Sequence, residues 1–191
     1  MKLVSPIDFN VDQWLWQGRA EWLAQVFYYF TYLGEAYVVA GLTVLASIYL
    51  WKKQTKIKAY SLLVSVAGGA GTVLLLKHFI ARPRPAHGFY AESLASFPSA
   101  HATLAVAFYG LLFYFLISQV ANKLHQKIYY CLAVLFILLL GFSRLYLGVH
   151  YLSDVVAGHL VGVVWLGIGV WIKNKLKSKN NELVTKCNQL K

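Results

Sequence analysis

Five long stretches of the sequence contain no lysine, arginine, aspartate or glutamate, and they limit most strongly what the chain can fold into. They cover residues 36–51, 59–76, 93–122, 128–143 and 155–172. Because a membrane-spanning helix needs about 20 mostly apolar residues, we predict spans near 31–51, 58–78, 100–120, 128–147 and 152–172. Composition agrees: 59% of the residues are hydrophobic and 13% are charged, against about 25% charged in average globular domains. The predicted fold is an all-α integral membrane helix bundle; the composition excludes disorder and argues against a soluble globular domain.

The first 30 residues have a different character from the rest of the chain. Charged residues interrupt their apolar pattern, and aromatic residues typical of membrane interfaces lie between them: Asp8, Asp12, Trp14, Trp16, Arg19, Glu21, Trp22, Tyr28 and Tyr29. We predict an amphipathic helix that lies on the membrane surface, with a sixth span as the alternative. The expected organisation is an interfacial segment 1–30, a transmembrane domain 31–172 and a basic tail 173–191.

The basic residues predict how the chain is oriented in the membrane. The net charge is +11, and twelve of the eighteen lysines and arginines fall in two connections and the tail, at 52–58, 121–127 and 173–191. The positive-inside rule places these segments, and so the C-terminus, on the cytoplasmic side of a cell (inner) membrane. The basic charge is then a topology and lipid-contact signal, and no nucleic-acid partner is expected.

The chemically interesting residues all fall at the opposite ends of the predicted spans. Lys77 closes the second span, and Pro98-Ser99-Ala100-His101 opens the third. Ser143-Arg144 ends the fourth span, and His150 and Asp154 open the fifth. Ionisable groups at membrane depth are costly and tend to mark functional sites. We therefore expect these segments to converge on one site at the outer, extracytoplasmic face.

The cations of this set predict an anion site. Lys77, Arg84 and Arg144 repel one another unless an anion joins them, and arginine forks suit the oxygens of a phosphate. Ser99 can donate its hydroxyl to the same oxygens, and the prolines around Arg84 hold it in a stiff loop. No carboxylate pair or His/Cys cluster accompanies the cations, so we predict neither a metal ion nor another cofactor.

Two histidines near the predicted anion site could catalyse phosphoryl transfer. His150 and Asp154 are four residues apart and share one face of a helix, so the carboxylate can accept a proton from one ring nitrogen. The other nitrogen is then free to attack phosphorus. His101 comes from another helix and can protonate the leaving oxygen from the opposite side.

These patterns resemble the type 2 phosphatidic acid phosphatase superfamily, the integral membrane lipid phosphatases. The family's Lys-x6-Arg-Pro motif is met by Lys77, Arg84 and Pro85, its Pro-Ser-Gly-His motif by residues 98–101, and its Ser-Arg-x5-His-x3-Asp motif by residues 143–154. The resemblance implies a phosphohistidine on His150 oriented by Asp154, with His101 as general acid. It implies phosphate binding by four residues: Lys77, Arg84, Ser99 and Arg144. Ala100 departs from the motif glycine, and this matters only if the position needs a positive φ.

The resemblance implies a lipid phosphate substrate that enters from the bilayer. Undecaprenyl diphosphate and phosphatidylglycerophosphate come first, before phosphatidic acid and a phosphorylated lipid A. An anion transporter or channel is a rival interpretation, and a vanadate-dependent peroxidase is another. The sequence leaves open the oligomeric state and the roles of three residues. Glu35 either snorkels or touches the basic pocket, Arg82 either contacts head groups or is solvated, and His159 is expected to make a structural hydrogen bond.

Overall fold

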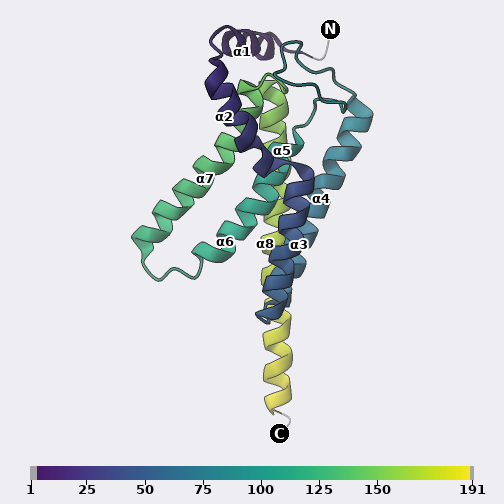
Figure 1. Cartoon of the computed structure of the whole chain (residues 1–191). Coiled ribbons are helices and arrows are strands. Elements are labelled where there is room, and N and C mark those ends of the chain that lie inside the picture. The colour runs from purple at the N-terminus through teal and green to yellow at the C-terminus, as the bar shows by residue number, and fades with distance from the viewer. Residues whose placement is uncertain (1–3, 190–191) are drawn as a thin grey trace.

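The computed structural model describes residues 4–189, with side chains described for residues 4–180 (Figure 1). Regular structure in this part of the chain is entirely helical. The helices are α1 (Pro6–Gln17), α2 (Glu21–Thr31), α3 (Ala36–Lys52), α4 (Lys56–Ile80), α5 (Ala100–Leu104), α6 (Leu111–Ile117), α7 (Lys123–Tyr146) and α8 (Leu152–Gln189). A 3₁₀ turn, Tyr32–Gly34, joins α2 to α3, and a π-helical segment, Ala105–Gly110, joins α5 to α6. The predicted basic tail, residues 173–191, lies partly outside the described side chains.

The helices confirm an all-α membrane bundle. Four segments are long and apolar enough to cross a membrane: Lys56–Ile80, Ala100–Ile117, Lys123–Tyr146 and Leu152–Asn180. A fifth candidate is the pair α2 and α3, which bends by 45° at its junction. The first span therefore differs from its prediction near 31–51, because α3 has 17 residues and reaches spanning length only with α2.

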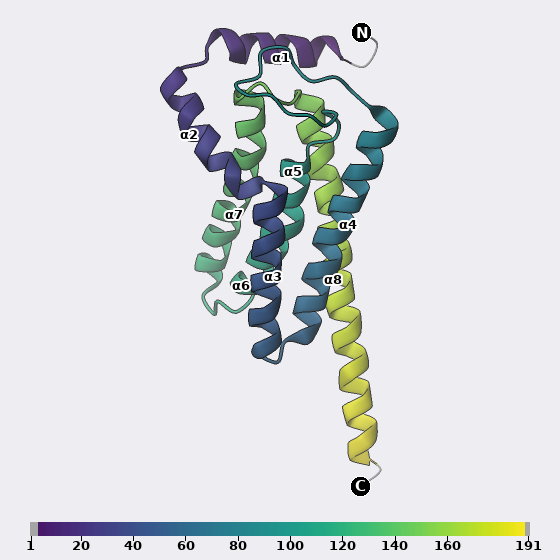
Figure 2. The ribbon, with the colours of Figure 1, turned by 45° about the vertical axis from the view of Figure 1, so that its right-hand side comes forward.

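The N-terminal segment is two helices rather than one, so the boundary expected at residue 30 falls inside α2. Figure 2 shows α1 lying across the end of the bundle, while α2 descends beside α7 toward α3. The side of α1 that faces the bundle is unusual, since Asp8 and Asp12 are buried. Leu15 is buried beside them, whereas the large apolar side chains of Ile7, Phe9, Trp14 and Trp16 are exposed. This helix therefore turns carboxylates toward the protein and aromatic rings toward its surroundings.

Small residues let α8 approach its neighbours closely. A Cβ on Gly158 would lie 2.6 Å from the carbonyl oxygen of Ser99, and one on Gly162 would lie 2.7 Å from that of Thr103. A Cβ on Gly68 would lie 2.1 Å from the ring of Trp165, so α4 and α8 are also in contact there. The start of α8 is thereby fixed against α5.

The two ends of the bundle differ in chemistry. In Figures 1 and 2 the last turns of α4 and α7 and the first turns of α5 and α8 lie at the same end, beneath α1. The lysine-rich connection between α3 and α4 and the far end of α8 lie at the other end. The expected convergence of the polar motifs at one end is what the structure shows.

Candidate active site

The candidate site is built around the turn that leads into α8. Gly148 has a φ of 64°, a left-handed conformation that favours glycine. A Cβ at this position would also lie 2.9 Å from the backbone oxygen of His87. The turn carries His150 into the protein, where it is 2% exposed, and Asp154 follows in the first turn of α8. The backbone N–H of Ser99 donates to the backbone oxygen of Asp154 at 3.0 Å, which ties the start of α5 to this turn.

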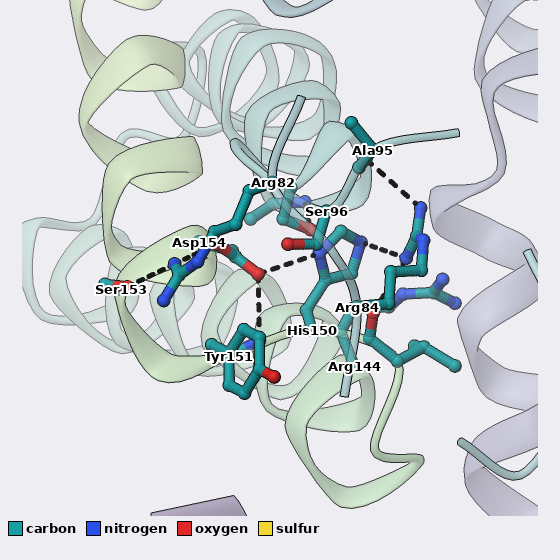
Figure 3. Close-up of polar contacts among 12 residues, drawn as sticks. Arg82, Arg84, Ala95, Ser96, Arg144, His150, Tyr151, Ser153 and Asp154 are labelled. Carbon is teal, nitrogen blue, oxygen red and sulfur yellow. Dashed lines mark hydrogen bonds and ion pairs between the residues drawn. The ribbon is translucent and has the colours of Figure 1, made fainter. Parts of the chain in front are cut away.

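The neighbours of His150 indicate which ring nitrogen carries the proton (Figure 3). Its Nδ1 lies 3.5 Å from Oδ2 of Asp154, and its Nε2 lies 3.2 Å from Nη1 of Arg84. A guanidinium only donates hydrogen bonds and an ionised carboxylate only accepts them. The arrangement therefore favours the tautomer with the hydrogen on Nδ1 and a lone pair on Nε2, directed at the arginine.

The surroundings also keep His150 neutral. Burial, followed by the positive charges of Arg144, Arg84 and Lys77, holds the pKa of His150 well below its ordinary value. Since both causes disfavour the imidazolium, the ring remains in the form with a free lone pair as the pH falls below 6.5. This form is the one that can act as a nucleophile.

The two expected phosphate-binding arginines are bridged by a carboxylate. Oε2 of Glu92 lies 2.6 Å from Nη2 of Arg84, and Oε1 of Glu92 accepts a hydrogen bond from Arg144. Arg144 is fully buried and also donates to the hydroxyl of Thr31 at 3.0 Å and to that of Tyr90. Glu92 thus neutralises the two arginines in the manner expected of a phosphate.

Lys77 and Ser99, the other two predicted phosphate-binding residues, are both buried. Lys77 is 6% exposed in the last turns of α4, and its ammonium donates to the backbone oxygen of Ala95. The Ser99 hydroxyl accepts a hydrogen bond from the N–H of Ala102 at 3.5 Å and caps α5. Ala100 follows at the first helical position without a positive φ, so its methyl group is harmless there.

The second histidine has a carboxylate partner from the N-terminal part of the chain. Nε2 of His101 lies 3.2 Å from Oε1 of Glu35, which precedes α3. A Cβ on the neighbouring Gly34 would lie 3.0 Å from the ring of His101, so the backbone passes close to the histidine. Of the two roles considered for Glu35, the contact with the polar site is correct and snorkelling is wrong.

Four more residues in or near the site were left open by the sequence interpretation or escaped it. Arg82 is 3% exposed and ion-paired to Asp8 and Asp154, so it neither contacts head groups nor is solvated. Glu92 and Asp8 escaped because each is a single carboxylate in an aperiodic or interfacial segment. His159 packs over Gly141, whose added Cβ would lie 2.4 Å from the ring.

A cavity beside Arg84 provides room for a ligand. Its volume is about 310 Å³, and it is lined by Arg84, Pro85, Ala86, Gly88, Tyr90, Ala91, Glu92, Gly148 and Val149. Burial raises the pKa of Tyr90 to about 12, so its hydroxyl stays neutral and can donate or accept hydrogen bonds at physiological pH. A polar group that enters this cavity meets the side of Arg84 and Glu92.

Comparison with known proteins assigns the family. The model of the PAP2 superfamily matches residues 58–178, which include all seven predicted site residues. The chain belongs to the PAP2 superfamily. It is 32% identical over 165 residues to phosphatidylglycerophosphatase B of Bacillus subtilis (strain 168), covering 83% of this chain and 79% of that protein. It is 33% identical over 141 residues to undecaprenyl-diphosphatase BcrC of the same organism, covering 70% of this chain and 67% of that protein.

A solved structure of this family supports the fold. The crystal structure of a transmembrane PAP2-type phosphatidylglycerolphosphate phosphatase from Bacillus subtilis aligns with a TM-score of 0.81 and 28% sequence identity. The alignment covers 88% of this chain and 85% of that chain. The PAP2 protein described here is thus a multi-pass membrane phosphatase, and the relatives favour this activity over the transporter and peroxidase interpretations.

Proposed function

We propose that this PAP2 protein hydrolyses a lipid phosphate through a phosphohistidine on His150, without a metal ion. Phosphate oxygens take the place of the Glu92 carboxylate between Arg84 and Arg144, and Lys77 and Ser99 contribute further hydrogen bonds. The described side chains include no group of three or more His, Cys, Asp and Glu residues placed to hold a metal ion. Charge on the phosphoryl oxygens is then neutralised by the side chains of Lys77, Arg84 and Arg144.

The reaction proceeds in two displacements on phosphorus. Nε2 of His150 attacks phosphorus, the bond to the lipid oxygen breaks, and His101 gives that oxygen a proton. The ring of His150 becomes positively charged, and Asp154 stabilises it through Nδ1–H. Water then attacks the phosphohistidine and loses a proton to His101, and the bond between phosphorus and Nε2 breaks to release inorganic phosphate.

One observation carries this proposal. The buried Nε2 of His150 is directed at Nη1 of Arg84, 3.2 Å away, inside a group of cations that a carboxylate currently neutralises. The other ring nitrogen, Nδ1, faces Asp154, so a phosphate bound to Arg84 would lie on the Nε2 side of the ring. Here the lone pair faces the place where an anion binds.

The relatives support the proposed substrate class, and the distribution of lysines supports the proposed side of the membrane. Phosphatidylglycerophosphate and undecaprenyl diphosphate head the candidates, before phosphatidic acid and a lipid A phosphate. The match to phosphatidylglycerophosphatase B covers more of this chain, which favours phosphatidylglycerophosphate. We place the site at the extracytoplasmic face of the cell membrane, because the lysine-rich connections lie at the opposite end of the bundle.

A panel of lipid phosphates tests this function. Purified protein is assayed for phosphate release from the four candidate lipids, with and without EDTA, beside the His150→Ala variant. We expect the highest kcat/KM with phosphatidylglycerophosphate, no loss with EDTA, and no turnover by the variant. Phosphate release by the variant, or a chelator effect that magnesium reverses, would contradict the mechanism.

A further inference from the structure

Arg82 links two carboxylates at the start of α8. Its Nη1 donates to Oδ1 of Asp154 at 2.5 Å, and its Nη2 donates to Oδ2 of Asp8 at 2.8 Å. The side chains of all three residues are at most 3% exposed. The network joins the partner of His150 to helix α1, which lies outside the region matched by the family model.

The two carboxylate oxygens of Asp154 contact different residues. Oδ1 accepts the guanidinium, as Figure 3 shows, while Oδ2 accepts the N–H of Tyr151 at 2.9 Å and faces Nδ1 of His150. A carboxylate whose Oδ1 is held in this way cannot rotate without breaking a charge-assisted hydrogen bond. The orientation of Oδ2 toward the nucleophile therefore depends on Arg82.

Asp8 in turn fixes Arg82 and the helix start. Its carboxylate accepts hydrogen bonds from the N–H of Ser153 and from the Ser153 hydroxyl, each at 2.8 Å, as well as from Arg82. Burial opposes ionisation of Asp8, but the hydrogen bonds from Ser153 and Arg82 outweigh it and lower its pKa to about 2. Asp8 is therefore a carboxylate throughout the range in which membrane enzymes work.

Asp8 changes the net charge of the network it forms with Arg82 and Asp154. Arg82 with Asp154 alone would be a neutral pair, whereas Asp8, Arg82 and Asp154 together carry one negative charge. A cationic ring forms at His150 when Nε2 bonds to phosphorus, and a neighbouring net negative charge stabilises it. The largest charge effects on His150 come from the cations Arg144, Arg84 and Lys77, and this network supplies negative charge on the Nδ1 side of the ring.

We propose that Arg82 and Asp8 are positioning residues of the phosphatase reaction, which hold Asp154 in the orientation and charge state that the His150 nucleophile needs. The proposal rests on the proposed role of Asp154. It adds a contribution to catalysis from α1, whose aromatic outer face alone suggests a membrane anchor.

The first test compares two carboxylates of α1. Asp8→Asn removes the ionic partner of Arg82, and Asp12→Asn makes the same change one turn further along, where Asp12 is also buried but faces Arg19 and His87. With nitrophenyl phosphate as substrate we expect kcat of Asp8→Asn to fall about 10-fold with KM within about twofold, a loss in the range measured for coupled network residues. Asp12→Asn should keep kcat within about twofold, and Asp8→Glu should recover part of the loss. Equal losses for Asp8→Asn and Asp12→Asn would overturn the proposal.

A double-mutant cycle separates positioning from a purely structural role. If Asp8 acts through Asp154, Asp8→Asn should cost nothing further in an Asp154→Asn background, whereas loss of helix docking would multiply the two defects. Arg82→Lys keeps the buried positive charge and provides the same cycle if Asp8→Asn does not fold. Multiplicative losses in both cycles would refute the proposal. A fully active Asp154→Asn protein would instead refute the proposed function on which it rests.

Discussion

Glu92 is the residue that most changes the description of the phosphate site. Arg144 is fully buried and the Arg84 side chain is 13% exposed, so the two cations side by side without a counter-ion would be unfavourable, and the carboxylate relieves this by bridging them. A phosphate that binds to the same arginines must displace it. We therefore expect Glu92 to stabilise the ligand-free protein and to compete with a phosphate for the two arginines.

Replacing Glu92 by Gln should strengthen anion binding. We expect the inhibition constants of vanadate and inorganic phosphate to fall about 5- to 10-fold, since removing one close charge pair is worth about 1 kcal/mol or more at a partly exposed position. The thermal midpoint of the ligand-free variant should fall, and vanadate should raise it by more than in the parent. Glu21→Gln, a change of an exposed glutamate in α2, serves as the control. Unchanged or weaker inhibition by both anions would contradict competition by Glu92.

The sequence predicted the site residues to the extent that they belong to spaced motifs. His150 and Asp154 share a helix face by their spacing, and the structure places them together as expected. Glu92, Asp8 and Glu35 are isolated carboxylates, and no spacing relates them to the arginines or histidines they contact. Their roles follow from three-dimensional pairing, which a buried charge requires but which a single sequence does not specify.

At the scale of helices, the contact between α8 and α5 fixes the turn that carries His150 relative to the helix that carries His101. Gly162 makes this contact possible, because a Cβ there would lie 2.6 Å from the Cβ of Val106 and 2.7 Å from the oxygen of Thr103. Gly167 lies on the same helix with no atom within 4 Å of its added Cβ. The two glycines form a matched pair for testing helix packing.

Gly162→Ala should therefore push α8 away from α5, while Gly167→Ala should not. We expect the first to destabilise the protein by about 1–3 kcal/mol, the usual cost of overpacking, and to lower kcat because Asp154 moves with α8. The second should have an unchanged or slightly higher thermal midpoint, since alanine favours helix more than glycine does. Thermal unfolding and nitrophenyl phosphate turnover of both variants measure this. Similar behaviour of the two variants would show that the packing argument is wrong.

The predictions for helices succeeded where apolar runs are long and failed where a helix bends. The spans near 58–78, 128–147 and 152–172 correspond to α4, α7 and α8. The bend of 45° between α2 and α3 and the π-helical segment Ala105–Gly110 were not predicted. Residues that are apolar on all faces of a helix leave no periodic signal for a change of direction.

At the scale of the whole molecule, the separation of catalytic and lysine-rich ends predicts the orientation in the membrane. In a protein with Cys131→Ser, a cysteine introduced by Ala86→Cys lies in the exposed loop at the catalytic end. It should react with a membrane-impermeant thiol reagent in intact cells. Cys187 in the tail should react only after the cells are permeabilised. The reverse labelling would place the site on the cytoplasmic side.

Four helix ends meet at one end of the molecule (Figure 1). The central claim of the proposed mechanism is that His150 attacks phosphorus there and His101 transfers the proton. His101→Ala tests it most directly, because a lipid alkoxide needs a proton to leave whereas a nitrophenolate does not. General acid catalysis is worth about 10²- to 10⁴-fold. We predict a loss of this size on the lipid phosphate, a much smaller loss in the first turnover of nitrophenyl phosphate, and an alkali-stable phosphoryl group that peptide mapping finds on His150. Equal losses on both substrates, or a phosphoryl group on another residue, would contradict the mechanism.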